Sequence, residues 1–101
     1  MLIKLKNKDQ LMLDDFTFKC AIGKNQIKSK KKEGDKSTPK GTFSLGKFYY
    51  RADRVKKPKN RLLTKIITKK LGWCDDPLDN SYNKEIKIPS KKKHEKLFKK
   101  N

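Results

Sequence analysis

The chain has 101 residues, with 29 lysine and arginine side chains against 11 acidic ones, for a net charge of +18. This length allows one domain at most, so we predict a single domain over residues 1–101. Repulsion between the excess positive charges opposes compaction of the chain. Only 33% of residues are hydrophobic, which leaves few side chains for a core. Five Phe, three Tyr and one Trp nevertheless exclude a purely solvated tail.

The N-terminal part of the chain favours strands. Residues 2–5 begin a strand, turn-forming residues follow at 7–9, and residues 11–13 return as the second arm of a hairpin. Residues 16–22 alternate between apolar and other side chains, which predicts a further strand. Its apolar face would consist of Phe16, Phe18, Cys20 and Ile22.

The middle of the chain is a basic loop followed by a strand. Residues 24–40 form the loop, and Thr38-Pro39-Lys40-Gly41 predicts a type I turn because Pro suits its second position and Gly its fourth. Residues 42–51 are the strongest strand candidate, with a bulge expected at Gly46.

The C-terminal part contains shorter candidates. Residues 62–68 predict a strand, with a helix as the alternative, and Asp75-Asp76-Pro77 predicts a turn. Residues 85–88 predict a short strand ended by Pro89. Over residues 90–98 we expect a short helix that Ser90 would cap.

The positive charge has two interpretations. It favours an anionic partner, because phosphate backbones bind basic proteins through counterion release. The alternative is compositional bias with solvated lysine faces, since only Arg51, Arg54 and Arg61 are arginine and the lysines are spread along the chain. Specific nucleic-acid contacts favour the arginine fork. We therefore disfavour nucleic acid as a partner, and cell-wall polymers and peptide carboxylates remain as candidates.

The residue pattern predicts no metal and no cofactor. Cys20, Cys74 and the single histidine, His94, are too few and too far apart for a zinc site. A disulfide between the cysteines stays open, with two small half-buried side chains as the simpler interpretation. Asp75, Asp76 and Asp79 lack the ligand spacing of a calcium loop.

No targeting or membrane-spanning segment is visible in the sequence. The first residues alternate between apolar and basic and contain no apolar stretch of signal-peptide length. We therefore expect a cytoplasmic protein as the sequence is written; a start site further upstream would change this expectation.

One charged cluster is a candidate for substrate binding. Arg51, Asp53 and Arg54 follow the strongest strand candidate, and an arginine oriented by a neighbouring carboxylate can bind a substrate carboxylate bidentately. The simpler interpretation is a structural salt bridge.

Several segments together carry a family signature. They are, in chain order, Phe18-Lys19-Cys20-Ala21-Ile22-Gly23, Ile27, Glu33-Gly34-Asp35, Thr38-Pro39-Lys40-Gly41-Thr42-Phe43, Tyr50-Arg51, Asp53-Arg54, Gly72-Trp73-Cys74-Asp75-Asp76-Pro77, Tyr82-Asn83 and Glu95-Lys96-Leu97. In order and spacing, from about Phe16 onward, they resemble the L,D-transpeptidase catalytic-domain family, often called YkuD-like.

The resemblance implies a mainly β fold, a curved mixed sheet or sandwich with at most a short C-terminal helix. It also implies a function in peptidoglycan cross-linking. A cysteine thiolate attacks a tetrapeptide stem, releases the terminal D-alanine and holds a thioester, which an amine of another stem resolves. Peptidoglycan stem peptides are then the expected partners, and members act in the periplasm or cell envelope.

The nucleophile motif of the family, H-x-G…[S/T]-x-G-C, does not occur in this sequence. We therefore expect a partial catalytic domain with no catalytic residue among residues 1–101, inactive by itself and marginally stable or dependent on a second chain. The matched motif residues are expected to build the scaffold. They are Glu33, Gly34, Asp35, Thr38, Pro39, Gly41, Gly72, Trp73, Cys74, Asp75, Asp76 and Pro77.

Overall fold

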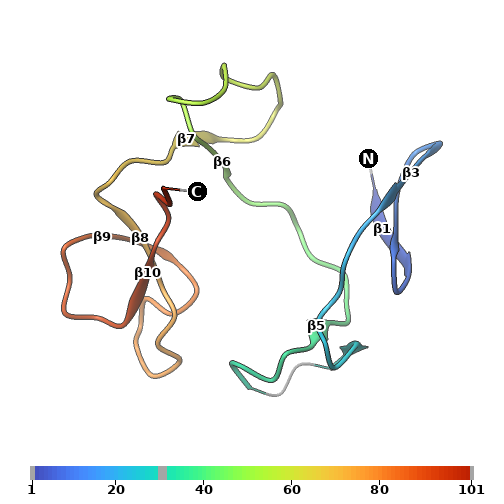
Figure 1. Cartoon of the computed structure of the whole chain (residues 1–101). Helices are drawn as coiled ribbons and strands as arrows, with labels where there is room; N and C mark the ends of the chain where they lie inside the picture. Colours follow the sequence, from blue (N-terminus) through green and yellow to red (C-terminus); the bar gives the residue numbers. More distant parts are fainter. Residues whose placement is uncertain (1, 30–31, 101) are drawn as a thin grey trace. The chain divides into compact units, whose positions relative to one another are not determined.

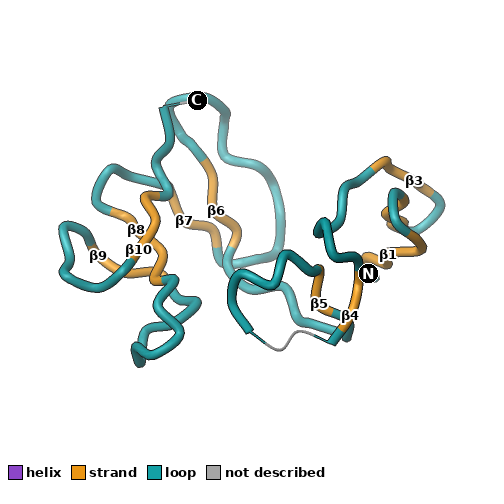
Figure 2. Tube along the Cα trace, turned by 60° about the horizontal axis from the view of Figure 1, so that its bottom comes forward, coloured by secondary structure: helices purple, strands orange, loops and turns teal. Residues whose placement is uncertain are grey.

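The computed structural model describes residues 2–29 and 32–100, and these stretches contain strands and loops but no helix (Figure 2). The mainly β fold expected from the sequence is confirmed. The strands form several small sheets, and the chain divides into two compact units, Met1–Phe43 and Ser44–Asn101.

The N-terminal unit contains an antiparallel three-stranded sheet in the order β1-β2-β3 and a parallel pair, β4-β5 (Figure 1). The bounds are β1 Ile3–Asn7, β2 Gln10–Leu13, β3 Phe16–Lys19, β4 Ile27–Lys28 and β5 Thr38–Pro39. The predicted hairpin and the strand that follows it are therefore confirmed, although β3 ends before Cys20.

Alternation makes one face of the β1-β2-β3 sheet apolar. The register pairs Ile3 with Leu13 and Leu5 with Leu11, and β2 continues this face to β3. There Phe16 and Phe18 stack with ring centroids 6.3 Å apart, yet they are 65% and 50% exposed. Successive residues of a strand point to opposite faces, which explains the pattern.

The turn predicted at Thr38–Gly41 is wrong, because the chain there is extended. Thr38 and Pro39 pair in parallel with Ile27 and Lys28. Pro39 has no N–H, but the donors on this side of the ladder are its neighbours: the Thr38 N–H donates to Gln26 at 2.9 Å and the Lys40 N–H to Lys28 at 3.0 Å. Proline fits an edge strand in this way.

The C-terminal unit contains a parallel pair, β6-β7, and an antiparallel sheet in the order β10-β8-β9. The bounds are β6 Phe48–Tyr50, β7 Thr64–Ile66, β8 Leu71–Cys74, β9 Glu85–Lys87 and β10 His94–Lys96. The strands predicted within residues 62–68 and 85–88 are confirmed. The long strand predicted over residues 42–51 is reduced to β6, the part that pairs with β7.

The helix predicted over residues 90–98 is wrong. The Ser90 hydroxyl accepts the N–H of Lys92 at 3.1 Å, as a cap would, but the chain then extends as β10 against β8. Leu97 continues this contact by donating its N–H to the carbonyl of Leu71 at 3.2 Å. Pairing with an open strand edge therefore outweighs the weak helix preference of a segment this short.

The buried core is small and lies around β8. Leu71, Cys74 and Ile88 are 7%, 0% and 5% exposed, and they are the buried apolar side chains among the described residues. Large apolar side chains such as Leu63 and Leu78 are 70% and 94% exposed. A core of this size gives little stabilisation against the conformational entropy of the chain.

We therefore expect the isolated chain to unfold over a broad temperature range that begins near room temperature. Differential scanning calorimetry of the 101-residue chain measures this directly. A sharp, cooperative transition well above room temperature would contradict the expectation and show that residues 1–101 are a self-sufficient domain.

Candidate functional site

Arg51 and Asp53 form the ion pair that the sequence predicted. Arg51 Nε and Nη2 donate to the two carboxylate oxygens of Asp53 at 2.7 and 2.6 Å. These hydrogen bonds raise the pKa of Arg51 and lower the pKa of Asp53. The guanidinium also lies over the ring of Phe98, 3.5 Å from its centroid, and donates to the carbonyl of Lys99. The fork of Arg51 is thus engaged within the protein.

Arg54 also forms a hydrogen bond with the backbone near the end of the chain. Its Nη2 donates to the carbonyl of Lys100 at 2.5 Å, and its N–H donates to the carbonyl of Arg51 at 3.1 Å. Together the two arginines hold the 51–54 turn against residues 98–100. A substrate-binding role for Arg51, Asp53 and Arg54 stays a prediction.

The first motif segment folds into a loop that returns to Gly23. The Thr38 hydroxyl accepts the N–H of Gly23 at 2.7 Å, and Asp35 Oδ1 accepts the N–H of Ser37 at 3.0 Å. Gly34 has a φ of 77°, a left-handed conformation that glycine adopts without strain. A side chain at Gly23 would lie 2.5 Å from the carbonyl oxygen of Lys36. Close approach of the backbone explains Gly23, and the left-handed φ explains Gly34. Hydrogen bonds to backbone N–H groups explain Asp35 and Thr38.

The other motif residues of that segment make fewer contacts. Gly41 has a φ of 147°, and a Cβ there would lie 3.1 Å from the ring of Phe43. Pro39 belongs to β5, and Glu33 is exposed. None of these residues presents a nucleophile, in keeping with a scaffold role.

The second motif segment contains the most buried strand of the protein. Cys74 is fully buried, and Gly72 lies under Ile88, where an added Cβ would stand 2.7 Å from Ile88 Cγ2. Trp73 points to the opposite face of β8, where its indole N–H donates to Asn83 Oδ1 at 3.1 Å. Sequence analysis identified these residues as motif members but did not assign the strand.

The predicted turn, Asp75-Asp76-Pro77, directly follows β8. Asp76 Oδ1 accepts the N–H of Leu78 at 3.0 Å, and its carbonyl accepts the N–H of Asp79 at 3.1 Å. Asp75 Oδ1 is buried and has no hydrogen-bond partner among the described residues. The turn prediction is confirmed.

A network centred on Glu85 was not predicted. Its carboxylate accepts hydrogen bonds from Lys47 at 2.5 Å, from Tyr49 at 3.1 Å and from Lys65. The hydrogen bonds from Lys47 and Lys65 lower the pKa of Glu85 to about 2, and burial raises the pKa of Tyr49. Tyr49 also meets Trp73 edge-on at 6.1 Å. The network joins β6 and β7 to β9, and no local pattern in the sequence indicates such a long-range cluster.

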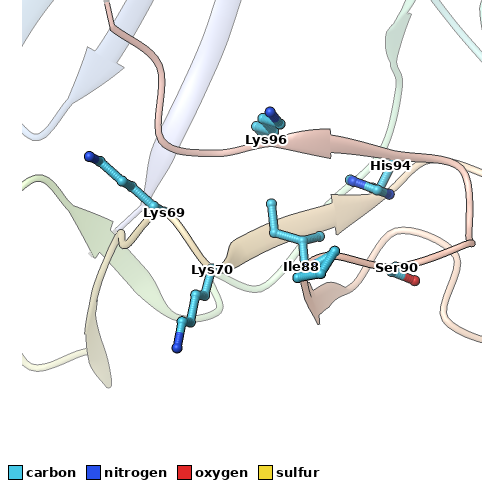
Figure 3. Close-up of a pocket in the computed structure, with 7 residues that line it drawn as sticks. Lys69, Lys70, Ile88, Ser90, His94 and Lys96 are labelled. Carbon is cyan, nitrogen blue, oxygen red and sulfur yellow. The ribbon is translucent and has the colours of Figure 1, made fainter.

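An open hollow of about 330 Å³ lies in the C-terminal unit. Ile88 and Pro89 form its apolar part, and His94 comes from β10 (Figure 3). The remaining lining residues are polar or charged: Lys69, Lys70, Ser90 and Lys96. His94 pairs directly with Cys74 across the β10-β8 ladder, but no hydrogen bond joins the two side chains in the described structure.

The N-terminal unit has a larger hollow, of about 680 Å³. It lies between β1, β2 and the segment around β5, with Leu2, Ile3 and Phe43 exposed along it. It contains no histidine, cysteine or acidic side chain.

Within residues 2–29 and 32–100, histidine, cysteine and acidic side chains form no group of three or more that could hold a metal ion. Over the same residues, no helix is long and apolar enough to cross a membrane.

Comparison with known proteins identifies the family. A model of the L,D-transpeptidase catalytic domain, YkuD, matches residues 3–99. No curated protein and no solved structure matches the chain significantly. The match includes both motif segments and extends to the first hairpin, which the sequence resemblance had not covered. The chain belongs to the L,D-transpeptidase catalytic domain family.

Proposed function

We propose that this chain is an L,D-transpeptidase-like protein of cell-wall biogenesis that acts on peptidoglycan stem peptides at the cell envelope. Residues 1–101 form scaffold, and the nucleophilic cysteine comes from polypeptide outside them. The family match supports the reaction class. The complete burial of Cys74 is the observation that carries the second part.

Cys74 is unsuited to attack a peptide carbonyl. A nucleophilic cysteine needs access to substrate and a base that removes its proton. Cys74 is 0% exposed within β8, and its cross-strand neighbour His94 makes its hydrogen bond elsewhere, between Nδ1 and the carbonyl of Lys92 at 2.6 Å. Its thiol therefore contributes to packing.

Cys20 is also poorly equipped for catalysis. It follows β3, and its backbone N–H donates to the carbonyl of Asp9 at 2.9 Å. The only histidine of the sequence lies in the other compact unit, so the N-terminal unit contains no imidazole that could serve as its base.

Intact-mass spectrometry tests this assignment. We expect no thioester after incubation of the chain with a tetrapeptide stem. We expect an adduct once a polypeptide bearing H-x-G…[S/T]-x-G-C from a family member is added, and the acyl group should then be on that added cysteine. Loss of D-alanine should accompany it, because the C–N bond of the stem breaks as the thioester forms.

An adduct on Cys20 or Cys74 of the chain alone would overturn the proposal. The Cys20→Ser variant is the control, since Cys20 lies outside the core and its replacement leaves Cys74 as the one remaining thiol. An adduct that persists in this variant would identify Cys74 as reactive despite its burial.

A second candidate function is a non-catalytic basic module that binds peptidoglycan or another polyanion. The net charge of +18 favours it. If this second function is correct, the chain should bind purified sacculi. No adduct should then form in the experiment above, whether or not the polypeptide is added.

A further inference from the structure

The hollow beside β8, β9 and β10 has an apolar floor held in place by the core. Ile88 is 5% exposed and packs over Gly72, where no larger side chain fits. Pro89 continues this floor, and His94 and Lys96 project from β10 on the same face, two residues apart. The shape of the floor is therefore set by the most buried part of the unit.

The rim of this hollow is cationic and lacks acidic partners. Figure 3 shows the ammonium groups of Lys69, Lys70 and Lys96 pointing away from Ile88 in different directions. The Lys69 ammonium lies 5.9 Å from the centroid of the Phe98 ring. No carboxylate lies within ion-pairing distance of these three lysines among the residues that the structure describes.

None of the described acidic side chains of this unit lines the hollow. Asp75 and Asp76 follow β8, where Asp76 accepts the N–H of Leu78 and Asp75 Oδ1 is buried. Asp53 pairs with Arg51, Asp79 with Lys92, and Glu85 with Lys47 and Lys65. Glu95 lies between His94 and Lys96 in β10, so alternation places it on the opposite face of the sheet. The field in the hollow is consequently positive.

Two further groups can contribute hydrogen bonds. The Ser90 hydroxyl accepts the N–H of Lys92 but has no acceptor for its own proton among the described residues. His94 uses Nδ1 toward the carbonyl of Lys92, which leaves Nε2 without a hydrogen bond within the described structure. A ligand in the hollow would thus meet a hydroxyl and an imidazole as well as ammonium groups.

We propose that this hollow binds successive phosphate groups of a phosphodiester chain that carries no aromatic bases. Lysine binds phosphate as a point charge, whereas planar carboxylates favour the arginine fork, and no arginine lines the hollow. Ammonium groups that diverge suit several anionic groups along one chain better than a single ion. Single-stranded nucleic acids favour aromatic stacking platforms, and no Phe, Tyr or Trp lines the hollow. The ring of Phe98, beside Lys69, is covered on one face by the guanidinium of Arg51.

The site is independent of the cysteine chemistry above, and the full 101-residue chain can be used to test it. A short glycerol phosphate oligomer is titrated into the protein while the ring resonances of His94 are followed by NMR. His94 is the only histidine, so its signals report on this hollow without ambiguity. We expect a saturable shift of these resonances, and calorimetry should give the same dissociation constant.

Two double variants that lose the same charge distinguish binding at the hollow from non-specific attraction to the net positive charge. We expect Lys70→Gln/Lys96→Gln to weaken binding at least about tenfold, and Lys56→Gln/Lys57→Gln, two exposed loop lysines, to weaken it less than about twofold. Amide spectra confirm that both variants keep the fold. If the first variant unfolds, the His94 shift in the unaltered protein still decides the question.

Several outcomes would overturn the proposal. Equal losses in the two double variants would show non-specific attraction to the net charge. An unchanged His94 spectrum at saturation would place the ligand elsewhere. Equal or tighter binding of a poly-glutamate of matched length would assign the hollow to carboxylates, and tighter binding of a single-stranded oligonucleotide at His94 would assign it to nucleic acid.

Discussion

Replacing Gly72 with alanine is expected to unfold the C-terminal unit under conditions in which the unaltered chain is folded. The added Cβ would lie 2.7 Å from Ile88 Cγ2 and 3.2 Å from the carbonyl oxygen of Glu95. Ile88 is β-branched and 5% exposed, so its methyl group cannot turn away, and the carbonyl belongs to the neighbouring strand. We expect a loss of about 2–3 kcal/mol, the cost of overpacking a tight site.

Urea titration at low temperature, followed by the fluorescence of Trp73, measures this effect. Trp73 is the only tryptophan and lies beside Gly72 in β8, so its emission reports on the same sheet. Gly46→Ala is the matched control, because an added Cβ at Gly46 meets no atom within 4 Å. Its midpoint should differ little from that of the unaltered chain.

A double-mutant cycle with Ile88→Ala tests the mechanism. Removal of Ile88 Cγ2 destabilises the unit but makes room for the new methyl group, so the two changes together should cost less than their sum. Strict additivity, or a Gly46→Ala variant as unstable as Gly72→Ala, would show that the close packing over Gly72 is not the cause.

The Glu85 network is expected to make the stability of the C-terminal unit fall between about pH 4.5 and pH 2. The pKa of Glu85 is lowered from 4.5 to about 2 in the folded unit, first by the hydrogen bonds from Lys47 and Lys65. A lowered pKa means that the unfolded chain binds the proton more tightly. The stabilisation by ionised Glu85 is therefore complete above the pKa that Glu85 has in the unfolded chain. It is lost as the pH falls through the pKa that Glu85 has in the folded unit.

The Glu85→Gln variant should lose about 1–2 kcal/mol at neutral pH, since the partners are partly exposed and water screens part of the attraction. Its stability should also vary less with pH over the acidic range. Glu95→Gln is the matched control: it removes the same charge, but no ion pair of Glu95 is found within the described structure. Equal losses in both variants would attribute the effect to net charge and exclude the network.

Urea midpoints measured by Trp73 fluorescence from neutral pH downward provide the comparison. Trp73 contacts Tyr49, which itself donates to Glu85, so the probe lies next to the network. A slope for the Glu85→Gln variant as steep as that of the unaltered chain would contradict the assignment.

Alternating and β-branched residue patterns each indicated a strand. The alternation that starts at Phe16 and the β-branched run around Ile66 both predicted strands that the structure contains. The hairpin of β1 and β2 could also be read locally, because its turn residues adjoin its strands in the chain. Local signals sufficed where the strand itself carries a clear residue pattern.

Elements whose own residues favour a turn or a helix could not be predicted in the same way. Ser90 and the residues after it suggested a helix, yet β10 forms because β8, twenty residues earlier, offers an open edge. Thr38-Pro39 suggested a turn but pairs with Ile27-Lys28 across the basic loop. Such pairings depend on contacts that no window of the sequence contains.

The candidate site shows the same division. The motif segments Glu33–Phe43 and Gly72–Pro77 were sufficient to indicate the family, because close backbone approaches at Gly23 and Gly72 and the turn at Asp76 restrict the residue types locally. The sequence alone thereby determined the mainly β class, the family and the absence of its nucleophile motif from these residues. Only the tertiary structure decided that Cys74 is buried, that Arg51 lies over the ring of Phe98, and that Glu85 and the lysines around His94 have opposite environments. The reason is that burial and ion pairing depend on contacts between segments that are far apart in the sequence.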